Sequence, residues 1–285
     1  RSSPSFRFRH KKHNGAGKTT LMRIMTLLQN PSSGTIFFDD YDILRDRKAI
    51  RSVLGYLPQD FRFFEKLKTW EFLDYGAGLA GIKGTRKRSE IVDEMLRKVG
   101  LYEVRDRWAN RLSGGMKRRL GIAQAIIGNP KVIIVDEPTT GLDPEERIRF
   151  RNILSEVSDK DVIIILSTHI VGDISSTCKK LALLNKGELK FEGSPDDMIE
   201  LVRGKVWEIF VTDPELQQIK EKYPIISTIP SEGGWEIQIV TEKLEGFDGK
   251  AIIPNIEHAY VYFMDYLLKD KMEMYSEKIG GDLFN

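Results

Sequence analysis

Two continuous apolar runs that end in polar residues constrain the fold of this chain more than any other feature. They are KVIIVDEP, residues 131–138, and DVIIILSTH, residues 161–169. Runs that are apolar at every position are typical of strands buried on both faces of a parallel sheet. The segment between them, PEERIRFRNILSEVS, has the pattern of an amphipathic helix. We therefore predict an α/β sheet domain with its chemistry at the carboxyl ends of the strands.

A glycine-rich loop opens the first predicted helix. Apolar residues recur at helical spacing through GKTTLMRIMTLLQ, residues 17–29, and NPSSG closes the helix. Backbone N–H groups at such a helix N-terminus can surround phosphate oxygens. Lys18 would then reach the β- and γ-phosphates, and the Thr19 hydroxyl would bind Mg²⁺. The other residues expected to bind nucleotide here are Asn14, Gly15, Ala16, Gly17 and Thr20. The alternative is a glycine-rich turn before an ordinary helix.

Two adjacent acids, Asp136 and Glu137, end the first apolar run. A carboxylate at this position can hold Mg²⁺ through water, and its neighbour can orient and polarise the water that attacks the γ-phosphate. Two acids at a buried strand end would otherwise be costly to desolvate. A purely structural role therefore explains the pair poorly.

The stretch LSGGMKRR, residues 112–119, predicts a second anion-binding helix N-terminus. Ser113, Gly114 and Gly115 precede a helix, with Ser113 in the N-cap position. Taken alone, this pattern is more often a plain junction between a loop and a helix. One nucleotide does not need both loops, so beside the other motifs it suggests that the two loops meet across a dimer interface.

The rest of the chain suggests three segments. Helical patterns with dense charge over residues 67–111 predict a helical insertion within the sheet domain. A boundary is expected near residues 193–204, followed by a small α+β domain. Its predicted elements are a strand at 205–212, a helix at 213–223, a hairpin within 230–240 and a last helix from about Pro254. The expected division is an atypical basic segment at 1–13, an ATPase domain at 14–200 and an accessory domain at 205–285.

Composition excludes several classes of protein. The net charge is +2, and the basic excess is local, because the first twelve residues hold Arg1, Arg7, Arg9, Lys11 and Lys12. A nucleic-acid-binding surface needs basic residues gathered on one face of the fold, so we expect no nucleic-acid partner. No apolar run approaches the roughly 18 residues of a membrane span. The single cysteine, Cys178, cannot form an internal disulfide, which favours a cytoplasmic setting.

Six motifs together resemble the ATP-binding subunit of an ABC transporter over residues 14–193. In order they are NGAGKTT, YLPQ with Gln59, LSGGMKRR, VIIVDEP, GLDP with Asp143, and STH with His169. The segments LSGGMKRRLGIAQAI and IEHAYVYFM, residues 112–126 and 256–264, are further similar to exporters of the daunorubicin-resistance type. In those exporters the ATPase and the permease are separate chains.

The resemblance implies a P-loop NTPase sheet domain that forms a head-to-tail dimer, homomeric or heteromeric, around two ATP molecules. Lys18, Thr19, Asp136 and Glu137 of one subunit would face Ser113 and Gly115 of the other. Gln59 would touch Mg²⁺ or the attacking water, Asp143 would couple the two sites, and His169 would contact the γ-phosphate. The partner would be a transmembrane permease at the inner face of the cell membrane, exporting a drug, antibiotic or lipid-like molecule.

The N-terminus departs from this family. Lys12 stands where the loop pattern has glycine, and His13 stands where the family usually has proline. The preceding SFRFRHKKH puts charges where a buried strand belongs. One hypothesis is a truncated or altered N-terminus with the homologous sequence beginning at Asn14, which predicts weak or absent activity. The other is a solvated basic arm that a partner orders.

Two alternative functions differ in class. The first is a non-catalytic subunit that binds nucleotide poorly and pairs with an intact partner. The retained Glu137 and His169 argue against a long-standing loss of catalysis. The second is a soluble ABC protein acting on ribosomes or DNA, which would need two such domains or a long coiled coil; the sequence shows neither.

Overall fold

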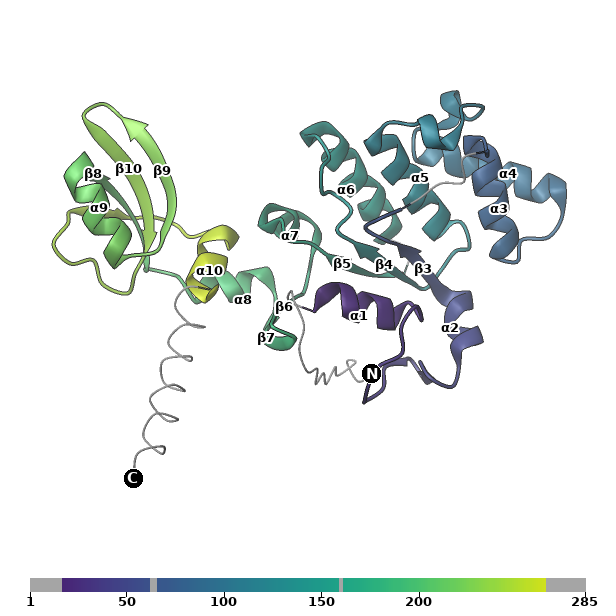
Figure 1. Ribbon diagram of the computed structural model, residues 1–285, viewed down its shortest axis with the longest axis horizontal. Helices are drawn as coiled ribbons and strands as arrows, with labels where there is room; N and C mark the ends of the chain where they lie inside the picture. The colour runs from purple at the N-terminus through teal and green to yellow at the C-terminus, as the bar shows by residue number, and fades with distance from the viewer. Residues whose placement is uncertain (1–16, 62–65, 159–160, 265–285) are drawn as a thin grey trace. The chain divides into compact units, whose positions relative to one another are not determined.

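A computed structural model describes residues 17–61, 66–158 and 161–264 of the chain (Figure 1). They fall into two compact units. The first unit extends to His169 and includes Leu183–Lys190, and the second comprises Ile170–Ala182 and the chain from Phe191 onward. Asn14, Gly15, Ala16 and the basic segment 1–13 lie outside the described residues. The division into segments 1–13, 14–200 and 205–285 stays a prediction.

A parallel sheet forms the centre of the first unit. Its strands are β3 (Leu54–Leu57), β4 (Val132–Asp136) and β5 (Ile163–Ser167), in the order β3-β4-β5. All five residues of β4 are buried, as the continuous apolar run predicts. Both runs therefore form parallel strands, and the predicted α/β fold is confirmed.

Helices cover both faces of this sheet (Figure 1). Ile133 and Val135 of β4 pack in one apolar cluster with α5 (Gly114–Ile126) and α6 (Pro144–Ser158). Val132 and Ile134 pack in a second cluster with α1 (Lys18–Met25). Because side chains alternate along a strand, neighbouring residues of β4 enter opposite layers.

α1 is shorter than the helix predicted over residues 17–29. It ends after Met25, where the Thr26 hydroxyl donates to the Met22 carbonyl at 2.8 Å. Leu27 then takes a left-handed conformation with φ of 62°, which cannot continue the helix. The Arg47 guanidinium donates at 3.0 Å to the carbonyl of Leu27, two residues beyond the end of the helix.

The remaining elements of the first unit include the predicted helical region. α6 spans the same residues as the predicted amphipathic helix, with Asp143 as an N-cap acceptor and Pro144 in the first turn. The other elements are the hairpin β1 (Phe37–Phe38) and β2 (Tyr41–Asp42), α2 (Arg47–Val53), α3 (Thr69–Leu79), α4 (Thr85–Lys98), η1 (Tyr102–Val104) and η2 (Ala109–Arg111).

The prediction that β5 is buried on both faces is wrong for the described residues. Ile163 is 59% exposed, and the next three residues of the strand are half-buried. Within residues 17–61, 66–158 and 161–264, β5 pairs with β4 alone and leaves its other edge open. The apolar run identified the strand correctly but carried no information about its position in the sheet.

The second unit is an α+β arrangement. Its elements are α7 (Val171–Thr177), α8 (Pro195–Glu200), β8 (Val206–Val211), α9 (Asp213–Lys222), β9 (Ile225–Ser231), β10 (Gly234–Val240), β11 (Gly249–Ala251) and α10 (Ile256–Tyr262). One face of the antiparallel sheet, ordered β11-β8-β10-β9, packs against α9 through Ile209, Ile237 and Ile219. The predicted strand, helix, hairpin and last helix are all present.

A further hairpin, β6 (Leu181–Asn185) and β7 (Glu188–Gly193), contributes residues to both units. In the part of the chain that the structure describes, helices with the length and apolarity of a membrane span are absent.

Candidate nucleotide-binding and hydrolysis site

The carboxyl ends of the three parallel strands bring the predicted polar residues to one edge of the sheet. Gln59 lies two residues beyond β3, Asp136 ends β4, and His169 lies two residues beyond β5. Asp136 and Ser167 are direct register partners. Parallel strands share one carboxyl edge, which is where open α/β sheets bind ligands.

Asp136 is a buried carboxylate with a buried hydroxyl beside it. The Ser167 hydroxyl donates to Oδ1 of Asp136, and both side chains are almost fully shielded from solvent. Burial raises the pKa of Tyr56 on the adjacent strand, and the charge of Asp136 raises this pKa further. The Tyr56 hydroxyl therefore stays protonated at neutral pH.

Glu137 is anchored through both its backbone and its side chain. Its N–H donates to the carbonyl of Ser167 at 3.0 Å and contacts the Ser167 hydroxyl oxygen at 3.3 Å. Its Oε2 accepts from the Thr140 hydroxyl at 3.4 Å and lies 3.1 Å from Nδ1 of His169. The carboxylate is mostly buried but retains some exposure. It is thus held in one orientation at the sheet edge.

His169 is the more exposed partner of this pair. A contact with a carboxylate oxygen requires a proton on Nδ1, so Nε2 is the nitrogen that could face a phosphate. The structure therefore brings together Glu137 and His169, which are predicted to act on the same γ-phosphate.

The N-terminus of α1 presents backbone donors next to Lys18. Gly17 precedes the helix with φ of 87°, a conformation that side chains disfavour. The first turn contains Lys18, Thr19 and Thr20 and has no acidic residue, so the positive end of the helix dipole is not neutralised locally. This environment favours an anion.

The LSGG turn and the loop ending in Asp143 both cap helices. Ser113 is confirmed as the N-cap of α5, because its hydroxyl accepts from the backbone N–H of Met116 at 3.2 Å. Gly114 and Gly115 form the first turn of α5. Asp143 Oδ1 accepts from the N–H of Glu146 at 2.9 Å. The predicted roles of these residues toward nucleotide stay predictions.

Sequence reasoning missed three residues that support the site. The Ser167 hydroxyl donates to the Asp136 carboxylate and accepts from the Glu137 backbone N–H, and the Thr140 hydroxyl donates to the Glu137 carboxylate. Arg118 of α5 donates to the carbonyl of Pro58, the residue before Gln59, at 3.1 Å. Aligning the ends of the two apolar runs pairs Ser167 with Asp136 only once the two strands are known to be neighbours, and the sequence has no comparable signal for Arg118.

The oxygen-containing side chains at this site are suitable ligands for Mg²⁺ bound together with a nucleotide. Mg²⁺ prefers oxygen ligands and is usually held by one or two protein groups together with phosphate oxygens and water. The Thr19 hydroxyl, the Gln59 amide and the Asp136 carboxylate are oxygen donors of this kind. Within the described ranges, three or more His, Cys, Asp or Glu side chains do not gather into a metal cluster.

Comparisons with known proteins identify the family. Residues 13–140 match the family model described as ABC transporter. The uncharacterized ABC transporter ATP-binding protein YxlF of Bacillus subtilis (strain 168) is 34% identical over 228 residues, covering 79% of this chain and 75% of that protein. The chain belongs to the ABC transporter ATP-binding proteins. Subunits of this family are ATPases, so the sequence-based assignment of family and enzyme class is confirmed.

Longer relatives contain an ABC region similar to this subunit. The probable multidrug ABC transporter ATP-binding protein YbhF of Escherichia coli (strain K12) is 35% identical over 67% of this chain but only 33% of its own length. ABC transporter A family member 8 of Arabidopsis thaliana is 38% identical over 65% of this chain and 20% of its own. A solved ATP-binding subunit of an ABC transporter superposes with a TM-score of 0.59 at 28% identity, covering 66% of this chain and 78% of that one.

Proposed function

We propose that this ABC ATPase binds Mg-ATP at the N-terminus of α1 and hydrolyses it at the sheet edge to drive a separate membrane permease. The observation that carries the proposal is the anchored Glu137. Its carboxylate contacts His169 Nδ1 and the Thr140 hydroxyl, and it directly follows the buried Asp136. This arrangement fits a group that orients a water molecule.

Each side chain has a role in this mechanism. Lys18 and the N–H groups at the start of α1 would bind phosphate oxygens, and Thr19, Gln59 and Asp136 would hold Mg²⁺. When bound, Mg²⁺ would supply positive charge that offsets the negative charge of the phosphates. Glu137 orients the attacking water and accepts its proton as the oxygen bonds to the γ-phosphorus. The bond from that phosphorus to the β–γ bridging oxygen breaks, and ADP leaves with the electron pair, while His169 steadies the γ-phosphate.

The proposed assembly is a head-to-tail dimer, homomeric or heteromeric, on a transmembrane permease at the inner face of the membrane. Ser113, Gly114 and Gly115 of one subunit would complete the site of the other, and Asp143 would couple the two sites. The exported molecule would be a drug, antibiotic or lipid-like compound. Support for this substrate class comes from sequence resemblance to resistance exporters and from the multidrug name of the E. coli relative.

The competing proposal is a subunit that binds nucleotide poorly and serves an intact partner. It is favoured by one observation, the replacement of the loop glycine by Lys12 beside His13. Calorimetry of Mg-ATP binding to the purified full chain separates the two proposals. Glu137→Gln suppresses hydrolysis during the titration, and Lys18→Ala is the matched control.

We expect the Glu137→Gln chain to bind Mg-ATP with a Kd in the micromolar to low millimolar range, on the order of −4 to −8 kcal/mol. The additional Lys18→Ala change should abolish the heat signal, because it removes the cation that pairs with the phosphates. Absence of binding in Glu137→Gln itself would refute the ATPase mechanism and favour the nucleotide-impaired subunit.

A further inference from the structure

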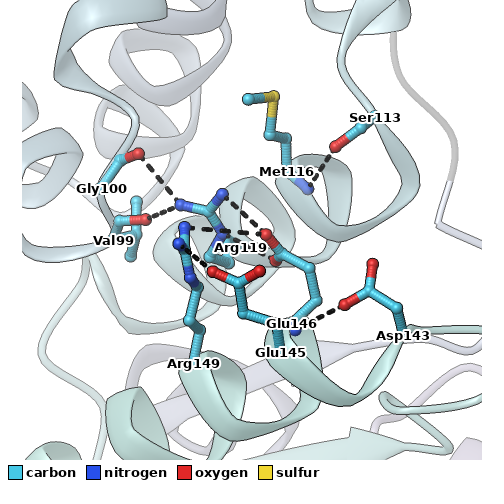
Figure 2. A network of polar contacts seen from close by, with 9 residues as sticks. All are labelled: Val99, Gly100, Ser113, Met116, Arg119, Asp143, Glu145, Glu146 and Arg149. Carbon is cyan, nitrogen blue, oxygen red and sulfur yellow. Dashed lines mark hydrogen bonds and ion pairs between the residues drawn. The ribbon is translucent and has the colours of Figure 1, made fainter.

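A buried arginine joins three elements near the LSGG turn (Figure 2). Arg119 of α5 is only 4% exposed. Its Nε and Nη2 donate to the two carboxylate oxygens of Glu146 on α6, at 3.1 and 3.3 Å. Its Nη1 donates to the carbonyls of Val99 and Gly100 beyond the end of α4, at 2.7 and 3.0 Å. One side chain thus contacts the helical region and the helix that follows Asp143.

Glu146 in turn contacts both functional loops. Its side chain lies so close to Gly115 that a Cβ on that glycine would be 2.4 Å from its Cδ and Oε2. Its backbone N–H donates to Asp143 Oδ1 at 2.9 Å. Gly115 belongs to the LSGG turn, and Asp143 ends the loop after Glu137. Glu146 therefore lies between the two loops that the proposed dimer directs at a second subunit.

The two parallel hydrogen bonds between Arg119 and Glu146 fix the orientation of the Glu146 side chain as well as its position. A guanidinium that binds both oxygens of a carboxylate fixes the plane as well as the distance of its partner. The remaining donor of Arg119 binds carbonyls at the negative end of a helix dipole, so the guanidinium cannot turn away easily. Burial also makes separation of the pair unfavourable, because Arg119 would lose its charged partner, while Glu146 would keep only Arg149, whose Nη1 lies 3.9 Å from its Oε1.

We propose that Arg119 and Glu146 are positioning residues that hold the Ser113–Gly115 turn and the Gly141–Asp143 loop in one fixed arrangement. The two loops then approach the nucleotide of a second subunit as a single surface. This inference rests on the proposed function, and it assigns the pair no contact with nucleotide. Both residues act through the backbone that they hold.

A neighbouring ion pair on the same helix provides a matched control. Glu145 pairs with Arg149 at 2.5 Å, but the two side chains are 76% and 52% exposed. Pairs of this kind contribute little to structure. Glu145→Gln and Glu146→Gln therefore make the same chemical change at adjacent positions of α6, one at the surface and one between the loops.

The first test measures ATP-dependent dimerisation of the full chain in the Glu137→Gln background. Size-exclusion chromatography with light scattering reports the fraction of dimer. Glu146→Gln should weaken dimerisation about tenfold, a typical coupling effect, while the Kd for Mg-ATP of the monomer stays within about twofold. Glu145→Gln should leave both quantities unchanged. Without the Glu137→Gln change, Glu146→Gln should lower kcat by about the same factor and leave KM little altered.

Combining substitutions tests whether the two residues act together. Arg119→Lys keeps the charge but cannot bind both Glu146 oxygens and the two carbonyls, so it should also weaken dimerisation. The double variant should be no weaker than the worse single variant. Effects that multiply would overturn the pairing. Hydrogen exchange of the nucleotide-free chain gives a second readout: Glu146→Gln should speed exchange at both 113–116 and 139–143, and acceleration at only one of them would overturn the link.

Mg-ATP binding and dimerisation of the Glu137→Gln parent distinguish the positioning role from the proposed function. If the Glu137→Gln parent binds no Mg-ATP, the ATPase mechanism fails and the positioning role falls with it. If the parent binds and dimerises, but Glu146→Gln behaves like Glu145→Gln, only the positioning role is overturned.

Discussion

Glu137 adopts a left-handed backbone conformation, with φ of 46°, that few residues other than glycine take. Such a conformation costs on the order of 1–3 kcal/mol and persists where neighbouring groups hold it. Here the Ser167 carbonyl accepts the Glu137 N–H, and Thr140 and His169 contact its carboxylate. The backbone strain is thus located at Glu137, the residue whose carboxylate orients the attacking water in the proposed mechanism.

The two glycines of the LSGG turn differ in what surrounds them. A Cβ on Gly115 would clash with the Glu146 side chain, whereas a Cβ on Gly114 would have nothing within 4 Å. Because Arg119 restrains Glu146, we expect Gly115→Ala to lower the free energy of unfolding by about 1–3 kcal/mol. Gly114→Ala should be neutral or should stabilise the chain by up to about 1 kcal/mol. Urea unfolding measures both, and equal effects would contradict a restrained Glu146.

At the scale of elements, the strands of the central sheet have very different surroundings. β4 lies between two strands and two helical layers, and its five residues are buried. β5 has one partner strand among the described residues, and Ile163 at its start is largely exposed. The two strands look alike in sequence, so their contributions to stability depend on position in the sheet.

This difference predicts unequal effects of the same substitution. Ile133→Ala in β4 removes a fully buried side chain and should cost about 2–5 kcal/mol of unfolding free energy. Ile163→Ala in β5 should cost less than about 1 kcal/mol, because much of that side chain already contacts solvent. Chemical unfolding of the two variants checks the ratio. Equal losses would show that the open edge of β5 is covered in solution.

For the whole molecule, the second unit has its own packing between α10 and the sheet. His258 of α10 is buried; its Nδ1 accepts from the N–H of Asn255 at 3.1 Å, and its Nε2 lies 3.2 Å from Oε1 of Gln238. These contacts suit a neutral imidazole with its proton on Nε2. Burial lowers the pKa of His258, although the charge of Glu257 opposes the shift.

A lowered pKa in the folded state makes the stability of the second unit depend on pH. Above the unfolded pKa of about 6.5, the imidazole is neutral in both states and its contribution is fully present. As pH falls below that value, the unfolded state binds the proton more readily, so stability declines until the folded pKa is passed. The chain has four histidines, so NMR titration against His258→Gln can assign its signal. A His258 pKa at or above 6.5 would contradict this account.

Short-range patterns in the amino-acid sequence were sufficient to place the local elements and the order of the motifs. The helix 144–158, the strand ends at Asp136 and Ser167 and the N-cap at Ser113 follow from hydrophobic periodicity, apolar runs and capping chemistry, which act over a few residues. The catalytic candidates were recognisable for the same reason, because each of them belongs to a short motif whose residues are close together in the sequence.

Which groups from distant parts of the chain meet in space depends on the tertiary fold. Ser167 contacts Asp136 through the register of two parallel strands, and Arg119 contacts Glu146, 27 positions away, through the packing of α5 on α6. The exposure of Ile163 likewise depends on the number of strands beside β5. Contacts of this kind depend on how whole elements pack against one another, and the short-range pattern that defines each element contains no information about its neighbours.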